Sequence, residues 1–75
     1  MRRDSRYRFL VNVNPSRQEV HDLDNEKTGY NECQINEIRD FRYLVSTELP
    51  GLVLWLSQNP PYDGCAYCLP RYNRG

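Results

Sequence analysis

The residues best suited to chemistry in this 75-residue chain are three cysteines and one histidine. Cys65 and Cys68 are separated by two residues, a spacing that lets both sulfur atoms of one tight turn reach the same metal ion. The remaining cysteine is Cys33, and the only histidine is His21. Thiolate and imidazole groups are the ligands that tetrahedral structural zinc prefers. The sequence therefore predicts one structural Zn²⁺ ion with four ligands: His21, Cys33, Cys65 and Cys68.

Other interpretations of the same four residues stay open. Cys65 and Cys68 could form a redox pair, although such pairs usually begin a helix in an α/β setting that is missing here, or they could be oxidised only during handling. Cys33 could be a small buried apolar residue, as free cysteine often is. His21 could be an ordinary residue of a strand surface. A complete four-ligand site would leave no open coordination position, which disfavours catalysis by the metal.

The chain length limits the stability that a hydrophobic core can supply. A domain of this size buries only about 60% of the surface that its unfolded chain exposes, so a metal or disulfides often supplement the core. An odd number of cysteines would leave one thiol over in a pure disulfide framework. Neither an N-terminal signal pattern nor an apolar run long enough to span a membrane is visible. A reducing cytoplasm, where thiols remain free to bind metal, is the expected compartment.

The charges balance, with ten basic and ten acidic residues and a formal net charge of zero. This balance weakens the case for electrostatic binding to nucleic acid, which relies on excess Lys and Arg. Arginines nevertheless gather near the two ends of the chain, where they could form a small basic patch or simply solubilise frayed termini. We expect residues 1–6 and 71–75 to be disordered and residues 7–70 to form one domain.

Two types of periodicity predict the elements that position the four ligands. Residues 7–14 alternate between apolar and polar types, which indicates a β-strand, and a turn over residues 14–17 would return the chain as a second strand over residues 18–23. Residues 41–45 alternate in the same way and predict a third strand. Between them, Ile35 and Ile38 are three apart and fit either one helical turn or a short extended piece.

A single helix is predicted after the third strand, from an apolar stripe at helical spacing: Leu49, Leu52, Val53 and Leu56. Ser46 or Thr47 offers an N-cap, and Pro50 fits only the first turn. The expected fold class is α+β: a β-hairpin and a third strand, with one short helix packed on the sheet and a zinc ion stapling the domain. Trp55 lies off the stripe, where it would seal an edge of the core or, if exposed, mark a binding site.

The order of these features resembles the small Ada-type zinc-binding modules. The family includes the metal domain of the bacterial methylphosphotriester DNA repair protein and modules appended to nucleases and competence proteins. The resemblance covers roughly residues 9–70, from the first strand and Val20-His21 through Cys33 to Tyr62-Asp63-Gly64-Cys65-Ala66-Tyr67-Cys68. It implies the fold and a zinc site. The repair protein uses four cysteines, beginning with two separated by three residues, so its methyl-accepting chemistry does not carry over to a chain with His21 and a longer loop.

The predicted function is that of a non-catalytic, zinc-stabilised binding module, acting as a monomer on a protein or nucleic-acid partner. Tyrosine and arginine are enriched at binding hot spots, which makes these residues the candidate contacts: Arg6, Arg8, Tyr67, Arg71 and Tyr72. DNA binding by the basic ends is a narrower version that depends mostly on the resemblance. The alternative is a thiol function at Cys65 and Cys68, either redox exchange or acceptance of an alkyl group.

Overall fold

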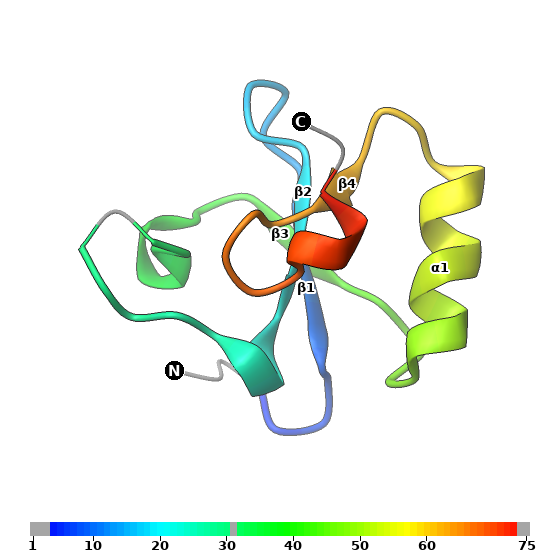
Figure 1. The fold of residues 1–75 in the computed structure, drawn as a ribbon, viewed down its shortest axis with the longest axis horizontal. Coiled ribbons are helices and arrows are strands. Elements are labelled where there is room, and N and C mark those ends of the chain that lie inside the picture. The colour runs from blue at the N-terminus through cyan, green and yellow to red at the C-terminus, as the bar shows by residue number, and fades with distance from the viewer. Residues whose placement is uncertain (1–3, 31, 74–75) are drawn as a thin grey trace.

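The computed structural model describes residues 4–30 and 32–73. Its centre is a four-stranded mixed sheet with the strand order β3-β1-β2-β4 (Figure 1). The strands are β1 (Phe9–Asn12), β2 (Glu19–Asp22), β3 (Phe41–Tyr43) and β4 (Asp63–Gly64). The described helices are α1 (Leu49–Gln58) and the short 3-10 helices η1 (Leu23–Asn25), η2 (Ile35–Glu37) and η3 (Pro70–Tyr72). The predicted α+β class is confirmed.

The predicted hairpin forms from β1 and β2. The two strands are antiparallel, with Leu10 opposite His21 and Val11 opposite Val20. The turn between them closes as the sequence indicates, since the Asn14 carbonyl accepts from the Arg17 amide at 2.8 Å and the Asn14 side chain accepts from the Ser16 amide at 3.0 Å. The hairpin thereby places His21 in a defined register near the end of β2.

The two edge strands differ from the sequence-based expectation. The predicted third strand forms as β3, which pairs antiparallel with β1. It ends at Tyr43, however, and Val45 is 96% exposed. β4 was not predicted, because a two-residue strand carries no periodicity. It runs parallel to β2, with Gly64 beside Val20. The Cys65 amide continues this pairing by donating to the Val20 carbonyl at 2.9 Å, so β4 delivers the second half of the cysteine cluster to β2.

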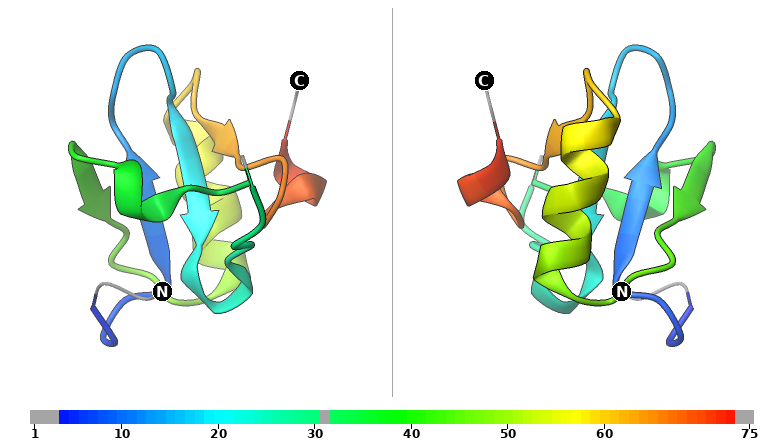
Figure 2. Two further views of the ribbon diagram at one scale, coloured as in Figure 1. Left: turned by 90° about the vertical axis from the view of Figure 1, so that its left-hand side faces the viewer. Right: turned by 90° about the vertical axis from the view of Figure 1, so that its right-hand side faces the viewer.

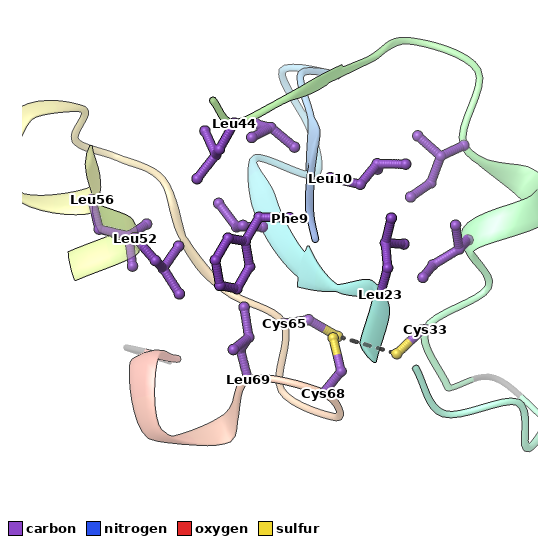
Figure 3. Close-up of a cluster of buried hydrophobic side chains, with 14 residues drawn as sticks. Phe9, Leu10, Leu23, Cys33, Leu44, Leu52, Leu56, Cys65, Cys68 and Leu69 are labelled. Atoms are coloured by element: carbon purple, nitrogen blue, oxygen red, sulfur yellow. Dashed lines mark hydrogen bonds between the residues drawn. The ribbon is translucent and has the colours of Figure 1, made fainter. Parts of the chain in front are cut away.

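The sheet is covered on both faces by different elements. Figure 2 shows α1 on one face and η2 on the other. Phe9 points toward Leu52 and Leu56 of α1, whereas Leu10, the next residue, points to the opposite side (Figure 3). Adjacent residues of a strand face opposite ways, so His21, which pairs with Leu10, lies on the η2 face. Burial of Ile35 and Ile38 around η2 completes that side of the core, and the segment is a helical turn rather than an extended piece.

Helix α1 forms where the apolar stripe predicted it, but the buried face is narrower. Leu52 and Leu56 are buried, whereas 39% of Leu49 and 47% of Val53 are exposed. The helix N-cap is Glu48 rather than Ser46 or Thr47. Ser46 instead closes the turn before the helix, since its hydroxyl oxygen accepts from the Glu48 amide at 3.1 Å. No described helix has the length and apolar character that a membrane span requires.

The described residues near both ends of the chain make contacts within the structure. Residues 1–3 and 74–75 of the predicted disordered ends lie outside the described residues. Arg6 and Asp4 form an exposed ion pair at 2.9 Å. Arg71 and Tyr72 belong to η3, and Tyr72 packs against the buried core. Residues 70–72 are therefore in contact with the rest of the described chain.

Candidate metal centre

The structure brings all four predicted ligands together. His21 comes from β2, Cys33 from the loop before η2, and Cys65 and Cys68 from the turn after β4. One ligand atom from each of the four lies within 4.8 Å of the others. All four side chains are buried, with His21 3% exposed and Cys33 7% exposed. These four His and Cys residues are positioned to bind one metal ion.

Two of the distances between ligand atoms match those around a tetrahedral ion. Two sulfur atoms bound to zinc at about 2.3 Å lie about 3.8 Å apart when the angles are tetrahedral. The Sγ atoms of Cys33 and Cys65 are 3.8 Å apart (Figure 3), and Cys68 Sγ lies 3.8 Å from His21 Nδ1. A disulfide would require about 2.05 Å between sulfur atoms, and all three cysteines are free thiols.

The turn that carries Cys65 and Cys68 is closed by its own backbone. The Leu69 amide donates to the Cys65 carbonyl at 2.9 Å, and the Tyr67 amide donates to Cys65 Sγ at 3.4 Å. The side-chain amide of Asn25 donates to the Cys68 carbonyl at 2.9 Å and ties the turn to η1. Both sulfur atoms therefore point to the same side of a fixed loop, as the two-residue spacing predicts.

Backbone amides from the first half of the chain donate to the other sulfur atoms. The Asp22 amide lies 3.2 Å from Cys68 Sγ, and the Lys27 amide lies 3.4 Å from Cys33 Sγ. Hydrogen bonds to the charged form of a group favour that form. The amides thus help to hold thiolates at the centre. Sequence reasoning missed these donors, because any residue type supplies a backbone amide.

Asp22 is fixed by a partly buried ion pair next to the centre. Arg8 donates from Nε to Asp22 Oδ1 at 3.1 Å and from an Nη atom to Asp22 Oδ2 at 3.0 Å. Asp22 Oδ1 also accepts from the Asp24 amide at 3.0 Å. Such a two-pronged pair restrains geometry as well as contributing energy. It therefore holds the strand end whose amide contacts Cys68.

Three thiols this close together do not all ionise without a cation. Hydrogen bonding from the side chains of Cys68 and His21 and from the Cys68 and Tyr67 amides lowers the pKa of Cys65 to about 3. The interaction with Cys65, together with burial, raises the pKa of Cys68, and burial raises the pKa of Cys33. Burial and the neighbouring thiol groups thus oppose the ionisation of Cys33 and Cys68. A divalent cation among the sulfur atoms would supply the positive charge that stabilises all three as thiolates.

One side of the centre faces solvent through a polar hollow of about 320 Å³, lined in part by His21, Cys33, Glu19 and Arg39. The Glu19 carboxyl group is partly buried, and this burial raises its pKa. The hollow gives an ion a path to the ligands. With four protein ligands gathered, the chemistry supported is that of a closed structural site rather than of a catalytic one.

Three of the five predicted partner contacts line one hollow. Arg8, Arg71 and Tyr72 line a shallow hollow of about 180 Å³ together, but the Arg8 guanidinium is engaged with Asp22. Arg6 pairs with Asp4 at the surface. Tyr67 lies on the turn that carries Cys65 and Cys68, called here the cysteine turn, and is 46% exposed.

Comparison with protein-family models, with curated proteins and with solved structures finds no match to this chain.

Proposed function

We propose that the chain is a small, non-catalytic binding module stabilised by one structural zinc ion held by His21, Cys33, Cys65 and Cys68. The observation that carries the proposal is the burial of four nitrogen and sulfur ligand atoms within 4.8 Å of one another. Thiolate ligands select zinc over magnesium or calcium, which prefer oxygen. Three thiolates and one neutral imidazole would give the filled site a formal charge of −1.

Zinc would supply stability that the core alone lacks. Structural zinc contributes roughly 10–16 kcal/mol to folding in small zinc-finger peptides. Here the ligands join the hairpin, the loop before η2 and the turn after β4, which are far apart in sequence. A metal at their meeting point would therefore close the whole domain. Free buried thiols also fit the reducing cytoplasm that we propose as the compartment.

An evolutionary relation to the Ada-type modules is part of the proposal. Its support is the order of elements: a hairpin carrying His21, a loop carrying Cys33, an apolar helix, and the turn with Cys65 and Cys68. The relation concerns the fold and the ligand set only. It does not extend to methyl acceptance, because the side chains of all four ligands are buried.

For the partner, a protein is favoured over a nucleic acid. The net charge is zero, and the guanidinium groups of Arg6 and Arg8 are already paired with carboxylates. Phosphate binding would require free cations, since it depends on the release of counterions from the nucleic acid. We expect duplex DNA mixed with the protein to show no salt-dependent mobility shift. A mobility shift that weakens steeply as the salt concentration rises would favour a nucleic-acid partner instead.

Native mass spectrometry of protein purified without added metal tests the zinc proposal, followed by a chelator titration monitored by circular dichroism. We expect one zinc per chain and loss of the folded signal when it is removed, because the ligands hold the elements together. Cys33→Ser should lower zinc affinity strongly, whereas Thr28→Ser, in the same loop, should not. A metal-free protein whose fold resists the chelator would refute the proposal.

The thiol alternative is tested on the same samples. A functional thiol at Cys65 or Cys68 should react quickly with iodoacetamide while the fold persists. Burial of both side chains, each 2% exposed, favours slow reaction instead. Fast alkylation of one thiol in the zinc-loaded, folded protein would favour the alternative.

A further inference from the structure

Helix α1 leaves part of the sheet uncovered. In the right-hand view of Figure 2, α1 lies toward the β4 side of the sheet, and β3 lies at the far edge beyond β1. Two hollows of about 330 and 340 Å³ lie between α1 and β3. They share Tyr43, Leu44 and Trp55, so they form one continuous surface, called here the α1/β3 groove.

The groove is lined mainly by apolar and aromatic side chains. Trp55 forms part of its floor and packs edge-on against Tyr62 at 5.1 Å between ring centroids. Leu54 lines one hollow and is 58% exposed. Helix α1 contains no charged residue between Leu49 and Gln58, which is unusual for a helix with an open face. Burial of such a face by a partner would remove apolar surface from water.

The groove also runs beside an open strand edge. β3 is the last strand on its side of the sheet. Its inward hydrogen bonds go to β1, where Arg42 pairs with Val11 and the Leu44 amide donates to the Phe9 carbonyl at 3.1 Å. Backbone groups alternate in direction along an antiparallel strand, so those of Tyr43 point outward. An extended chain can pair with such an edge while its side chains enter a neighbouring groove.

Among the described residues, the only charged one that lines the groove is a cation. Arg42 lines the second hollow, and within residues 4–30 and 32–73 no aspartate or glutamate lines either one. Arg42 is exposed and takes part in none of the ion pairs among the described residues. A carboxylate on a partner would therefore find a complementary charge beside the apolar floor.

We infer that the α1/β3 groove binds an extended peptide segment of a partner protein, with an apolar or aromatic side chain next to Asp or Glu. The segment pairs with the outer edge of β3, its apolar side chain lies against Trp55 and Leu54, and its carboxylate meets Arg42. This inference rests on the proposed role as a binding module and names the chemistry of its partner.

A phage-displayed peptide library selected on the zinc-loaded protein tests the inference. Enriched peptides should carry an apolar or aromatic residue beside Asp or Glu. Their binding can be followed by the emission of Trp55, the single tryptophan of the chain. We expect Leu54→Lys to weaken binding at least tenfold, and Arg42→Glu to weaken it at least fivefold and to shift the preference toward Lys or Arg.

Two matched controls separate the groove from general effects. Val53→Lys adds the same charge to the same helix at a residue that is 47% exposed and does not line the groove. Arg39→Glu reverses a charge at the polar hollow near the metal centre instead. Both should bind the selected peptides as tightly as the unaltered protein.

Three outcomes would overturn the inference: selection without a shared sequence pattern, equal binding by the groove and control variants, or a dimer abolished by Leu54→Lys. The last would make a second copy of the chain the occupant. Zinc content and thermal unfolding are measured on the same samples. A protein that binds one zinc but no peptide would refute the groove alone, whereas a metal-free, chelator-resistant protein would refute the proposed zinc-stabilised module.

Discussion

The substitution Gly64→Ala is expected to destabilise the fold, because the backbone at Gly64 is closely packed. A Cβ atom added there would lie 2.8 Å from both the Cβ and the carbonyl oxygen of Leu69 and 2.9 Å from the Cβ of Tyr72. Contacts this short occur with atoms close to or within the backbone, which cannot rotate away. Gly64 precedes Cys65 and pairs with Val20 in the parallel ladder. The substitution Gly64→Ala should therefore separate η3 from β4 and disturb the cysteine turn.

The expected cost follows from two opposing effects. Overpacking of a tight site lowers the free energy of unfolding by about 1–3 kcal/mol. Replacing Gly by Ala also restricts the unfolded chain, which returns about 0.4–1 kcal/mol. The net loss is then about 1–2 kcal/mol, or a Tm lowered by about 5–15 °C in a domain of this size. Thermal unfolding by circular dichroism should be compared at one fixed free zinc concentration, because bound metal raises Tm by mass action.

Gly29→Ala is the matched control. The three atoms nearest to a Cβ added at Gly29 all belong to the side chain of Glu32, whose flexible end can move. The control should leave Tm unchanged or slightly raised, since only the effect on the unfolded chain remains. A Gly64→Ala protein as stable as the Gly29→Ala protein would refute the close packing of η3 against β4.

Further substitutions test the surroundings of the centre. Arg8→Met leaves the buried Asp22 carboxylate without its main partner and should lower the free energy of unfolding by about 1–3 kcal/mol in urea titrations. Arg6→Met, at a surface ion pair, should change nothing measurable. Equal effects of the two would refute the structural role of the Arg8 pair. Gln34 has a φ of 53°, so Gln34→Gly should keep or slightly raise Tm, and Gln34→Val should lower the free energy of unfolding by about 1 kcal/mol or more. The opposite order in thermal unfolding would show that this residue is not in the left-handed region.

The local part of the fold followed from periodicity and turn residues. The alternation around Phe9 and Val11 predicted a strand, and the spacing of Leu52 and Leu56 predicted a helix, because neighbouring residues alone decide which face is apolar. The exact ends were less well predicted. Val45 continues the alternating pattern but is exposed, since β1 offers no further partner to an extended β3.

The ligand set was also accessible from the sequence, owing to its chemistry. Soft ligands are scarce in this chain, so three cysteines and one histidine left a single four-ligand combination. The two-residue gap between Cys65 and Cys68 is a local signal for a shared ion. That His21 lies beside this pair required the fold, because the pairing of β2 with β4 joins residues more than forty positions apart. The approach of Cys33, in the loop before η2, likewise depended on the fold.

The sequence by itself determined the residue chemistry and the local elements of this protein: a zinc-type ligand set, a hairpin and an amphipathic helix. Tertiary structure alone decided the short parallel strand β4, the amide donors to the sulfur atoms, the Arg8–Asp22 pair and the groove beside β3. Each of these depends on contacts between distant segments. Residue type specifies a side chain or a periodicity, but the approach of two backbones depends on how the whole chain packs.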